Sequence, residues 1–203
     1  MARRETPPRE RILLAAHTEF AERGLAGARI DTIARSAEAS KERLYAHFKT
    51  KRELFDAALG ASIDRWVAAV PLDARDLPGW ASRLYLHFSE HVDDARLLLW
   101  GQIEGVTLAS PGVVDHAELE ARRDGVRQAQ AEGLIATDWR PDEVLTMSFG
   151  LVLAWFVTPV TTNVHLGDTE RRAIVVQEAV TRLLSGGPLP PEASPGESAV
   201  SQA

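Results

Sequence analysis

Apolar residues recur at helical spacing along most of the chain, and no stretch of useful length alternates as a β-strand does. In the first stretch Ile12, Ala16 and Phe20 share one face, and Gly24 is expected to end the helix. The Asp93-Asp94 pair is expected to separate two later helices. Helices are predicted over residues 10–23, as a short pair over 30–48, and over 51–70, 78–92, 94–109, 112–132, 141–158 and 168–185. The pattern therefore predicts an all-α protein.

Residues 30–48 predict two short helices joined by a tight turn. Ile33 can face inward from the first helix, and Ser40 suits the N-cap of the second because its hydroxyl can accept from a free backbone N–H. Leu44 and Phe48, four residues apart, would fix the second helix to the core. A helix pair held at a fixed angle can present its second helix to the major groove of DNA.

The remaining side chains of the second helix suit contacts with DNA. Lys41, Tyr45 and His47 can bind phosphates, which position a protein without reading sequence. Arg43 can pair bidentately with guanine, and Glu42 can accept from cytosine. These residues alone leave open a second interpretation, in which this is a solvated helix face in a small helical hairpin.

The surrounding sequence favours DNA binding, because the stretch from Arg9 to Leu59 resembles the N-terminal DNA-binding domain of the TetR family of transcriptional regulators. The matching landmarks are the RERIL opening, Phe20 with Arg23-Gly24, Ile33-Ala34, Ser40-Lys41, Leu44-Tyr45, His47-Phe48, Lys51 and Leu54-Phe55. The resemblance implies a DNA-facing surface made of Thr32, Ser40, Lys41, Arg43, Tyr45, His47 and Lys51.

Three positions depart from the family pattern. Glu38 stands in the turn where the family usually has glycine, and a left-handed backbone there would cost roughly 1 kcal/mol. Ala39 replaces the commoner valine, and Arg29 stands where the family tends to place a serine or threonine cap. We therefore expect the first helix of the pair to be less well capped, with its recognition partner unaffected.

Composition narrows the function classes. The chain has no cysteine, which excludes disulfides, thiolate catalysis and cysteine metal sites. Residues 1–60 hold 12 Lys and Arg against 9 Asp and Glu, a net charge of +3, and residues 61–203 hold 11 against 20, a net charge of −9. The basic end therefore coincides with the helix pair. The N-terminus lacks the apolar run of a signal peptide, so a cytoplasmic location is expected.

Two domains and a tail are predicted. Residues 1–50 form the three-helix DNA-binding domain, with residues 1–8 as a flexible arm. Residues 51–186 form a larger helical domain for effector binding and dimerisation, in which 51–70 is the connecting helix. Residues 187–203 have the composition of a disordered tail.

The most apolar run covers residues 144–157. It is shorter than the ~20 residues that a membrane span needs, so we expect a helix buried on several sides and no membrane association. From the residues alone, this helix and the last one could be core helices of a monomer. The resemblance implies that the last two helices pair with those of a second copy, giving a homodimer that would bind a near-palindromic operator.

Aromatic residues are frequent between residues 72 and 185, and a site between helices could hold a small hydrophobic or aromatic effector. The predicted apolar lining residues are Trp66, Phe88, Trp100, Ile103, Met147 and Leu151, with Gln102, Glu104 and Arg127 as polar contacts. Taken singly, each of these residues fits packing or surface better than it fits contact with a ligand.

An enzyme is the competing class. His87, Glu90 and His91 fit the H-x-x-E-H pattern of inverted zinc peptidases, but three fixed positions arise easily by chance. No Ser-His-Asp spacing, phosphate loop or dinucleotide fingerprint accompanies them, so no catalysis, metal or cofactor is predicted. The favoured function is a ligand-responsive transcriptional repressor. The alternative is a helical small-molecule or metal-binding protein whose DNA-binding unit is vestigial.

Overall fold

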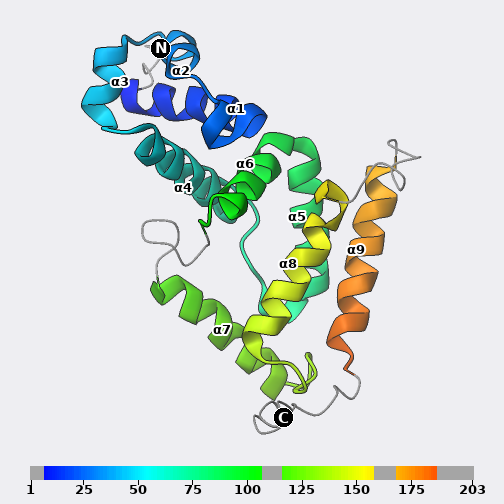
Figure 1. The fold of residues 1–203 in the computed structure, drawn as a ribbon. Helices are drawn as coiled ribbons and strands as arrows, with labels where there is room; N and C mark the ends of the chain where they lie inside the picture. Colours follow the sequence, from blue (N-terminus) through cyan, green and yellow to red (C-terminus); the bar gives the residue numbers. More distant parts are fainter. Residues whose placement is uncertain (1–6, 107–115, 158–167, 187–203) are drawn as a thin grey trace, which may run out of the picture.

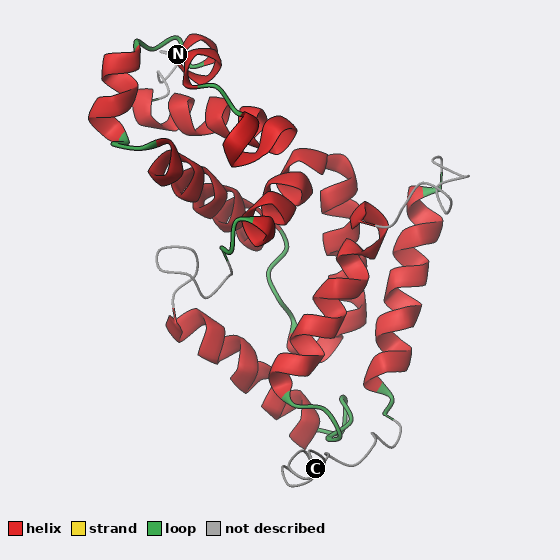
Figure 2. Cartoon of the chain, in the orientation of Figure 1, coloured by secondary structure: helices red, strands yellow, loops and turns green. Residues whose placement is uncertain are grey.

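The computed structural model describes residues 7–106, 116–157 and 168–186. These residues form α-helices, one short 3₁₀ helix and no strand, which confirms the all-α prediction (Figures 1 and 2). The elements are α1 (Pro8–Gly27), α2 (Ile30–Ser36), α3 (Lys41–His47), α4 (Lys51–Ala69), η1 (Ala74–Asp76), α5 (Leu77–Glu90), α6 (Val92–Ile103), α7 (His116–Ala131), α8 (Pro141–Val157) and α9 (Thr169–Leu184). The predicted tail, most of the predicted arm and residues 107–115 lie outside the described ranges.

Three predicted helix boundaries were wrong. The first helix does not end at Gly24 but changes direction there, with φ 64° and ψ −178°, and continues to Gly27. The break between α5 and α6 falls at His91, and Asp94 lies inside α6, where acidic residues suit the first turn. α6 ends at Ile103 instead of residue 109, because the chain turns through Gly105 at φ 74°.

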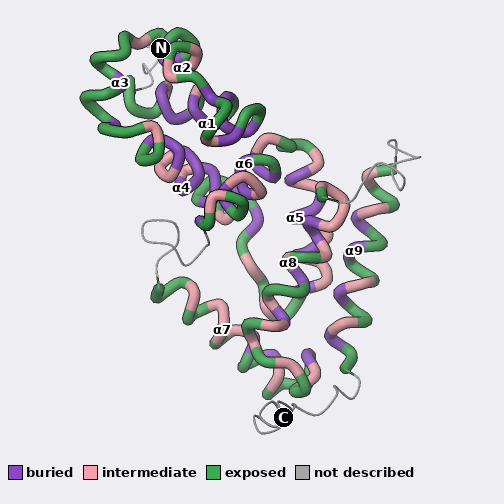
Figure 3. The backbone as a smooth tube through the Cα atoms, viewed as in Figure 1, coloured by how far each residue is buried: buried purple, intermediate pink, exposed green. Residues whose placement is uncertain are grey.

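Helices α1 to α3 form a small unit with its own apolar centre. Ile12, Phe20, Ile33 and Leu44 are fully buried there, and Figure 3 shows most residues of α3 as exposed. Phe20 also meets Phe55 of α4 edge to face, with ring centroids 5.1 Å apart. The long helix α4 therefore leads out of this unit while remaining packed against α1.

The rest of the chain packs around α5, which contacts α8 and α9, while α6 lies against α1 and α4 (Figure 1). α7 contacts η1 and α8. The apolar helix α8 buries Val144 and Val152 and exposes Met147 and Val157. Among the described residues, no helix combines the length and apolar character needed to cross a membrane.

A buried carboxylate lies where α1 meets α6. Asp94 Oδ1 accepts from His17 Nε2 at 2.7 Å and from Ser62 Oγ at 2.6 Å, and Arg65 lies at 3.5 Å. Burial alone would raise the pKa of Asp94, but these hydrogen bonds and the attraction to His17 and Arg65 lower the pKa to about 2. The ionised carboxylate is thus stabilised in the folded state.

This pKa shift predicts a loss of stability in acid. Because the folded pKa lies below the ordinary value of 3.8, the stabilising contribution of Asp94 is fully present only above the ordinary pKa and is lost as the pH falls through about 2. Between pH 4.5 and pH 2.5 we expect the free energy of unfolding to drop by roughly 1.5 kcal/mol more in the wild type than in Asp94→Asn. Urea unfolding at pH 4.5 and pH 2.5 measures the difference, and equal drops in the two proteins would contradict it.

Candidate nucleic-acid interface and effector cavity

The helix pair α2–α3 is held by local hydrogen bonds and by buried apolar residues. Ser40 Oγ accepts from the backbone N–H of Arg43 at 3.2 Å, as expected of an N-cap. Leu44 is fully buried and Phe48 is 2% exposed, so the inner side of α3 is fixed to the core. The other side of α3 therefore faces solvent as one continuous polar surface.

The turn between the two helices carries backbone strain. Glu38 has φ 51°, in the left-handed region that favours glycine, and its side chain is exposed. Glu38→Gly is expected to raise the free energy of unfolding by about 1 kcal/mol. Chemical denaturation measures this gain. Glu38→Ala keeps the Cβ and should give no gain, so equal effects of the two variants would refute the explanation.

The start of α2 lacks a side-chain cap, as the departure at Arg29 predicts. The structure supplies a partner from another helix, because the backbone N–H of Arg29 donates to Glu19 Oε1 of α1 at 2.9 Å. Glu19 is only 6% exposed, and its other contact is an ion pair with Arg23. This bond ties the entry of α2 to α1.

The sequence-predicted DNA-facing residues lie on α2, α3 and the start of α4. Arg43, Glu42 and His47 are exposed, Tyr45 is 46% exposed, and Thr32 is half-buried. Hydrogen bonds from its own backbone and from the Ser40 hydroxyl lower the pKa of Glu42, which favours its acceptor form. Arg43 forms no ion pair with an acidic residue in the part of the chain that the structure describes.

The two lysines of this surface have partners within the protein. Lys41 pairs with Asp31 of α2, and Lys51 Nζ donates to the backbone carbonyl of Ala26 at 3.1 Å. Both contacts are at least partly solvent-exposed, so a phosphate could replace them at little cost. Lys51 also lies near the junction of α1 and α2, because Ala26 precedes that turn.

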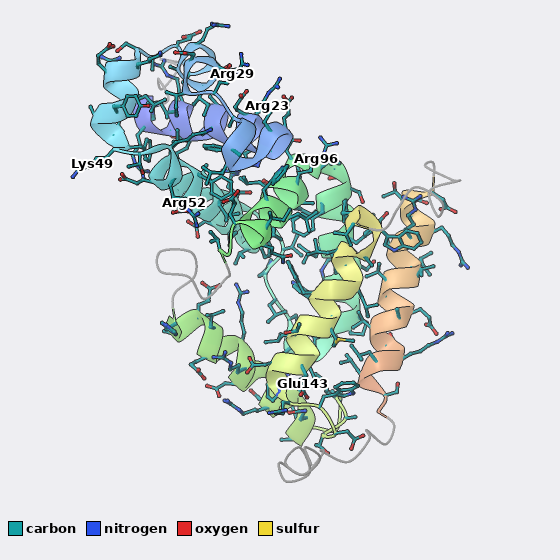
Figure 4. The ribbon with its side chains drawn as sticks, in the orientation of Figure 1. Arg23, Arg29, Lys49, Arg52, Arg96 and Glu143 are labelled. Carbon is teal, nitrogen blue, oxygen red and sulfur yellow. The ribbon has the colours of Figure 1, made fainter. Side chains whose placement is uncertain are left out.

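Two further cations adjoin this surface that sequence analysis missed. Arg29 precedes α2 and Lys49 follows α3, and Figure 4 shows both side chains extending outward from the helix pair. Neither forms an ion pair with a carboxylate of the described residues. The sequence did offer a sign that these two residues could contact DNA, because each is a basic residue at one end of the α2–α3 helix pair.

Phosphate contacts and base contacts should respond differently to mutation. Tyr45→Ala and Lys51→Ala are expected to weaken binding to specific and non-specific duplexes alike, and Lys51→Ala should lower the salt slope by about 1. Titrations of labelled duplexes at several salt concentrations measure both quantities. A loss confined to one DNA sequence would contradict the phosphate assignment.

A cavity of about 620 Å³ lies among α4, α5, α6, α7 and α8. Its walls are mainly apolar and include Trp66 of α4 and Phe149 of α8, whose rings are stacked with centroids 6.0 Å apart. Arg122 and Arg123 of α7 form its charged side, but Arg122 pairs with Glu118, and Arg123 pairs with Asp142 and Glu120. The cavity is therefore mainly apolar, and the two arginines at its edge are already paired with carboxylates of the protein.

Of the sequence-predicted pocket residues, the structure brings Trp66 and Gln102 to this cavity. Phe88 lies behind Trp66, edge to face at 5.6 Å, and Trp100 packs against Gly24. The others lie elsewhere: Ile103 and Met147 are exposed, Leu151 is half-buried outside the lining, Glu104 pairs with Arg52, and Arg127 pairs with Asp124. The lining that prediction missed includes Leu59, Ile63, Leu98, Leu99, Thr146, Gly150 and Leu153.

The H-x-x-E-H residues do not assemble a metal site. His87 Nε2 lies 3.4 Å from Asp94 Oδ2, and its ring centroid is 4.6 Å from that of His91, while Glu90 is exposed. In the described ranges, no group of three or more His, Cys, Asp or Glu side chains could hold a metal ion.

Comparisons with known proteins agree with the two-part architecture. Residues 12–58 match the family model described as bacterial regulatory proteins, tetR family, and residues 76–182 match the Tetracyclin repressor-like C-terminal domain. The chain belongs to the TetR family. It is therefore a DNA-binding transcriptional regulator, and helices α2 and α3 form its helix-turn-helix.

Relatives cover most of this TetR-family regulator. It is 37% identical over 157 residues to the HTH-type transcriptional repressor SCO4008 of Streptomyces coelicolor, covering 77% of this chain and 81% of the relative. A crystal structure of the transcriptional regulator SCO4942 of the same organism is 35% identical, with a TM-score of 0.74 over 87% of this chain and 98% of that one. The HTH-type transcriptional activator FasR of Mycolicibacterium smegmatis matches over 62 residues at 42% identity, which is 30% of this chain and 28% of FasR.

Proposed function

We propose that this TetR-family regulator is a homodimeric repressor that leaves a near-palindromic operator when a small apolar or aromatic molecule enters its cavity. The observation that carries the proposal is the joint presence of an exposed recognition helix and a separate apolar cavity lined by α4, the helix that follows it. A regulator that binds DNA would act in the cytoplasm.

Repression is favoured over activation by the breadth of the similarity. SCO4008, a repressor by name, matches over 157 residues, which is 77% of this chain, whereas the activator FasR matches over 62 residues.

In this proposal the recognition surface divides into two kinds of contact. Arg43 and Glu42 project from the first turn of α3 and would reach base edges, as N-terminal residues of a recognition helix do. The phosphate contacts would come from Thr32, Ser40, Lys41, Tyr45, His47 and Lys51, together with Arg29 and Lys49. Along the chain, the two proposed base-reading residues therefore have proposed phosphate contacts both before and after them.

A dimer through α8 and α9 is supported by apolar residues left on their outer sides. Met147 is 46% exposed on α8, while Ile174 is 56% exposed and Val175 37% on α9. Large exposed apolar residues grouped on two neighbouring helices are typical of an association surface. A two-fold axis through this surface would give two recognition helices to one operator.

The effector class follows from the cavity. Its volume of about 620 Å³ lies within the range of small-molecule sites, and aromatic and aliphatic side chains form most of its walls. Because Arg122 and Arg123 already have carboxylate partners, the cavity does not require a charged ligand. We therefore expect an uncharged apolar or aromatic compound.

Selection of binding sites from random duplex DNA at near-physiological salt tests the proposal. Recovery of one near-palindromic sequence is the expected result, and only weak, salt-sensitive binding would contradict it. Apolar compounds can then be screened for release of the selected operator. Gly150→Phe provides the control, because Gly150 lines the cavity and an added Cβ would meet no atom within 4 Å. This variant should bind the operator but fail to respond to the compound.

A further inference from the structure

Among the contacts between the DNA-binding helices and the rest of the chain is one buried carboxylate. Asp94 of α6 receives hydrogen bonds from His17 of α1 at 2.7 Å and Ser62 of α4 at 2.6 Å. Arg65 of α4 and His87 of α5 approach it at 3.5 Å and 3.4 Å. Four helices therefore converge on a side chain that is only 9% exposed. We call this group of five residues the Asp94 joint.

Burial distinguishes this contact from the other ion pairs of the described residues. The His17 side chain is 14% exposed, whereas most other pairs, such as Arg96 with Asp93, include at least one side chain that is about half exposed or more. An exposed ion pair contributes little to the free energy of folding, and its two side chains can adopt many relative positions. A buried carboxylate that loses its donors cannot replace them with water without cost, so its bonds fix the helices in one arrangement.

The Asp94 joint also adjoins the cavity. Ser62 directly precedes Ile63, which lines the cavity from α4, and Asp94 lies one turn before Leu98, which lines it from α6. The Ser62–Asp94 bond thus joins two walls of the cavity, and the His17–Asp94 bond joins one of those walls to α1. The same carboxylate is shared by both contacts.

We propose that Asp94 is a positioning residue for operator recognition, which with His17 and Ser62 holds the DNA-binding helices at one orientation on the larger domain. In a dimer this orientation sets the separation of the two recognition helices, so the inference rests on the proposed dimeric function. A ligand that moves α4 relative to α6 stretches the Ser62–Asp94 bond and releases α1 from that orientation.

Variants of His17 separate the hydrogen bond from simple packing. His17→Leu keeps an apolar body but removes the donor, and His17→Gln restores a donor close to the position of Nε2. Arg96→Gln is the control, because Arg96 lies on α6 like Asp94 (Figure 4). Its partner Asp93 is also on α6, so this ion pair joins no second helix. Ser62→Ala removes the second bond and serves if His17→Leu does not fold.

The first readout is the distance between the two domains. Two cysteines are introduced at exposed positions, Ser36→Cys on α2 and Ala131→Cys on α7. Because the chain has no cysteine of its own, a thiol-reactive spin label attaches to these two positions alone. Double electron–electron resonance on labelled protein diluted into unlabelled protein reports distances within one chain. We expect one narrow distribution for the wild type, His17→Gln and Arg96→Gln, and a broad one for His17→Leu and Ser62→Ala.

The second readout is operator spacing. The wild type, His17→Gln and Arg96→Gln should bind the selected operator at least tenfold more tightly than the same operator with two base pairs inserted between half-sites. His17→Leu should lose most of this discrimination while keeping its affinity for non-specific DNA. A merely structural role would change stability without changing the spacing preference.

A folded His17→Leu protein with the wild-type distance distribution and the wild-type spacing preference would overturn the proposal. If the wild type itself ignores spacing, the dimeric function fails instead. The distance distribution within one chain still tests the Asp94 joint in that case, because it does not depend on a second subunit.

Discussion

Replacing Arg43 with alanine is expected to cost about 1–3 kcal/mol of operator binding and to relax the preference for one base in each half-site. Arg43 is exposed in the first turn of α3, its backbone N–H bonds to Ser40, and no carboxylate of the described residues neutralises its side chain. The guanidinium is thus free to reach a base edge. Binding to a set of operators that differ at one base pair measures both effects.

Arg43→Lys is the matched control, because lysine keeps the charge and loses the planar pair of donors. We expect it to retain most of the non-specific affinity and to lose the base preference. If Arg43→Ala weakens all sequences by the same factor, Arg43 contacts phosphate and the base-reading assignment is wrong. If binding is unchanged, the recognition helix itself has been misplaced.

Gly24→Ala is expected to destabilise the protein by about 3 kcal/mol. The backbone at Gly24 has φ 64° and ψ −178°, a conformation open almost only to glycine. An added Cβ would also lie 2.7 Å from Cε3 of Trp100, whose ring packs on the bend of α1. Both the backbone and the ring of α6 would have to move. Chemical denaturation measures the loss.

Two comparisons separate the causes of this loss. Gly27→Ala lies in the same helix without a positive φ, and its Cβ would meet only Arg23 Cβ at 3.3 Å, so a small effect is expected. Adding Trp100→Leu to Gly24→Ala removes the clash but keeps the backbone strain, and should restore part of the stability relative to Trp100→Leu alone. A harmless Gly24→Ala would show that α1 is not bent as described.

Local patterns predicted the helix pair, and the family resemblance predicted that it binds DNA and that Glu38 and Arg29 depart from the usual turn and cap. The cap at Ser40, the spacing of Leu44 and Phe48 and the strain at Glu38 each depend on residues within one or two turns, and the structure shows all three. The uncapped start of α2 was also predictable. Its compensation by Glu19 was not, because the bond spans ten residues and two helices.

The cavity was harder to predict because α8 is apolar on nearly every side. Periodicity alone could not distinguish Phe149 and Leu153, which line the cavity, from Met147 and Leu151, which do not. Which side of such a helix faces a neighbour depends on how α4, α6 and α7 are placed around it. The same limit applies to α6, where Leu98 lines the cavity and Trp100 packs on α1.

The sequence by itself determined the all-α class and the short helix pair, because capping and helical periodicity act over a few residues. The resemblance to the TetR family added the DNA-binding role and the residues expected to face DNA. The tertiary structure alone decided the lining of the cavity and the role of Asp94. The sequence suggested that Asp94 separates two helices, whereas in the structure it lies within α6 and binds residues 77 and 32 positions away. Contacts of that range depend on how helices pack against one another, which no local pattern encodes.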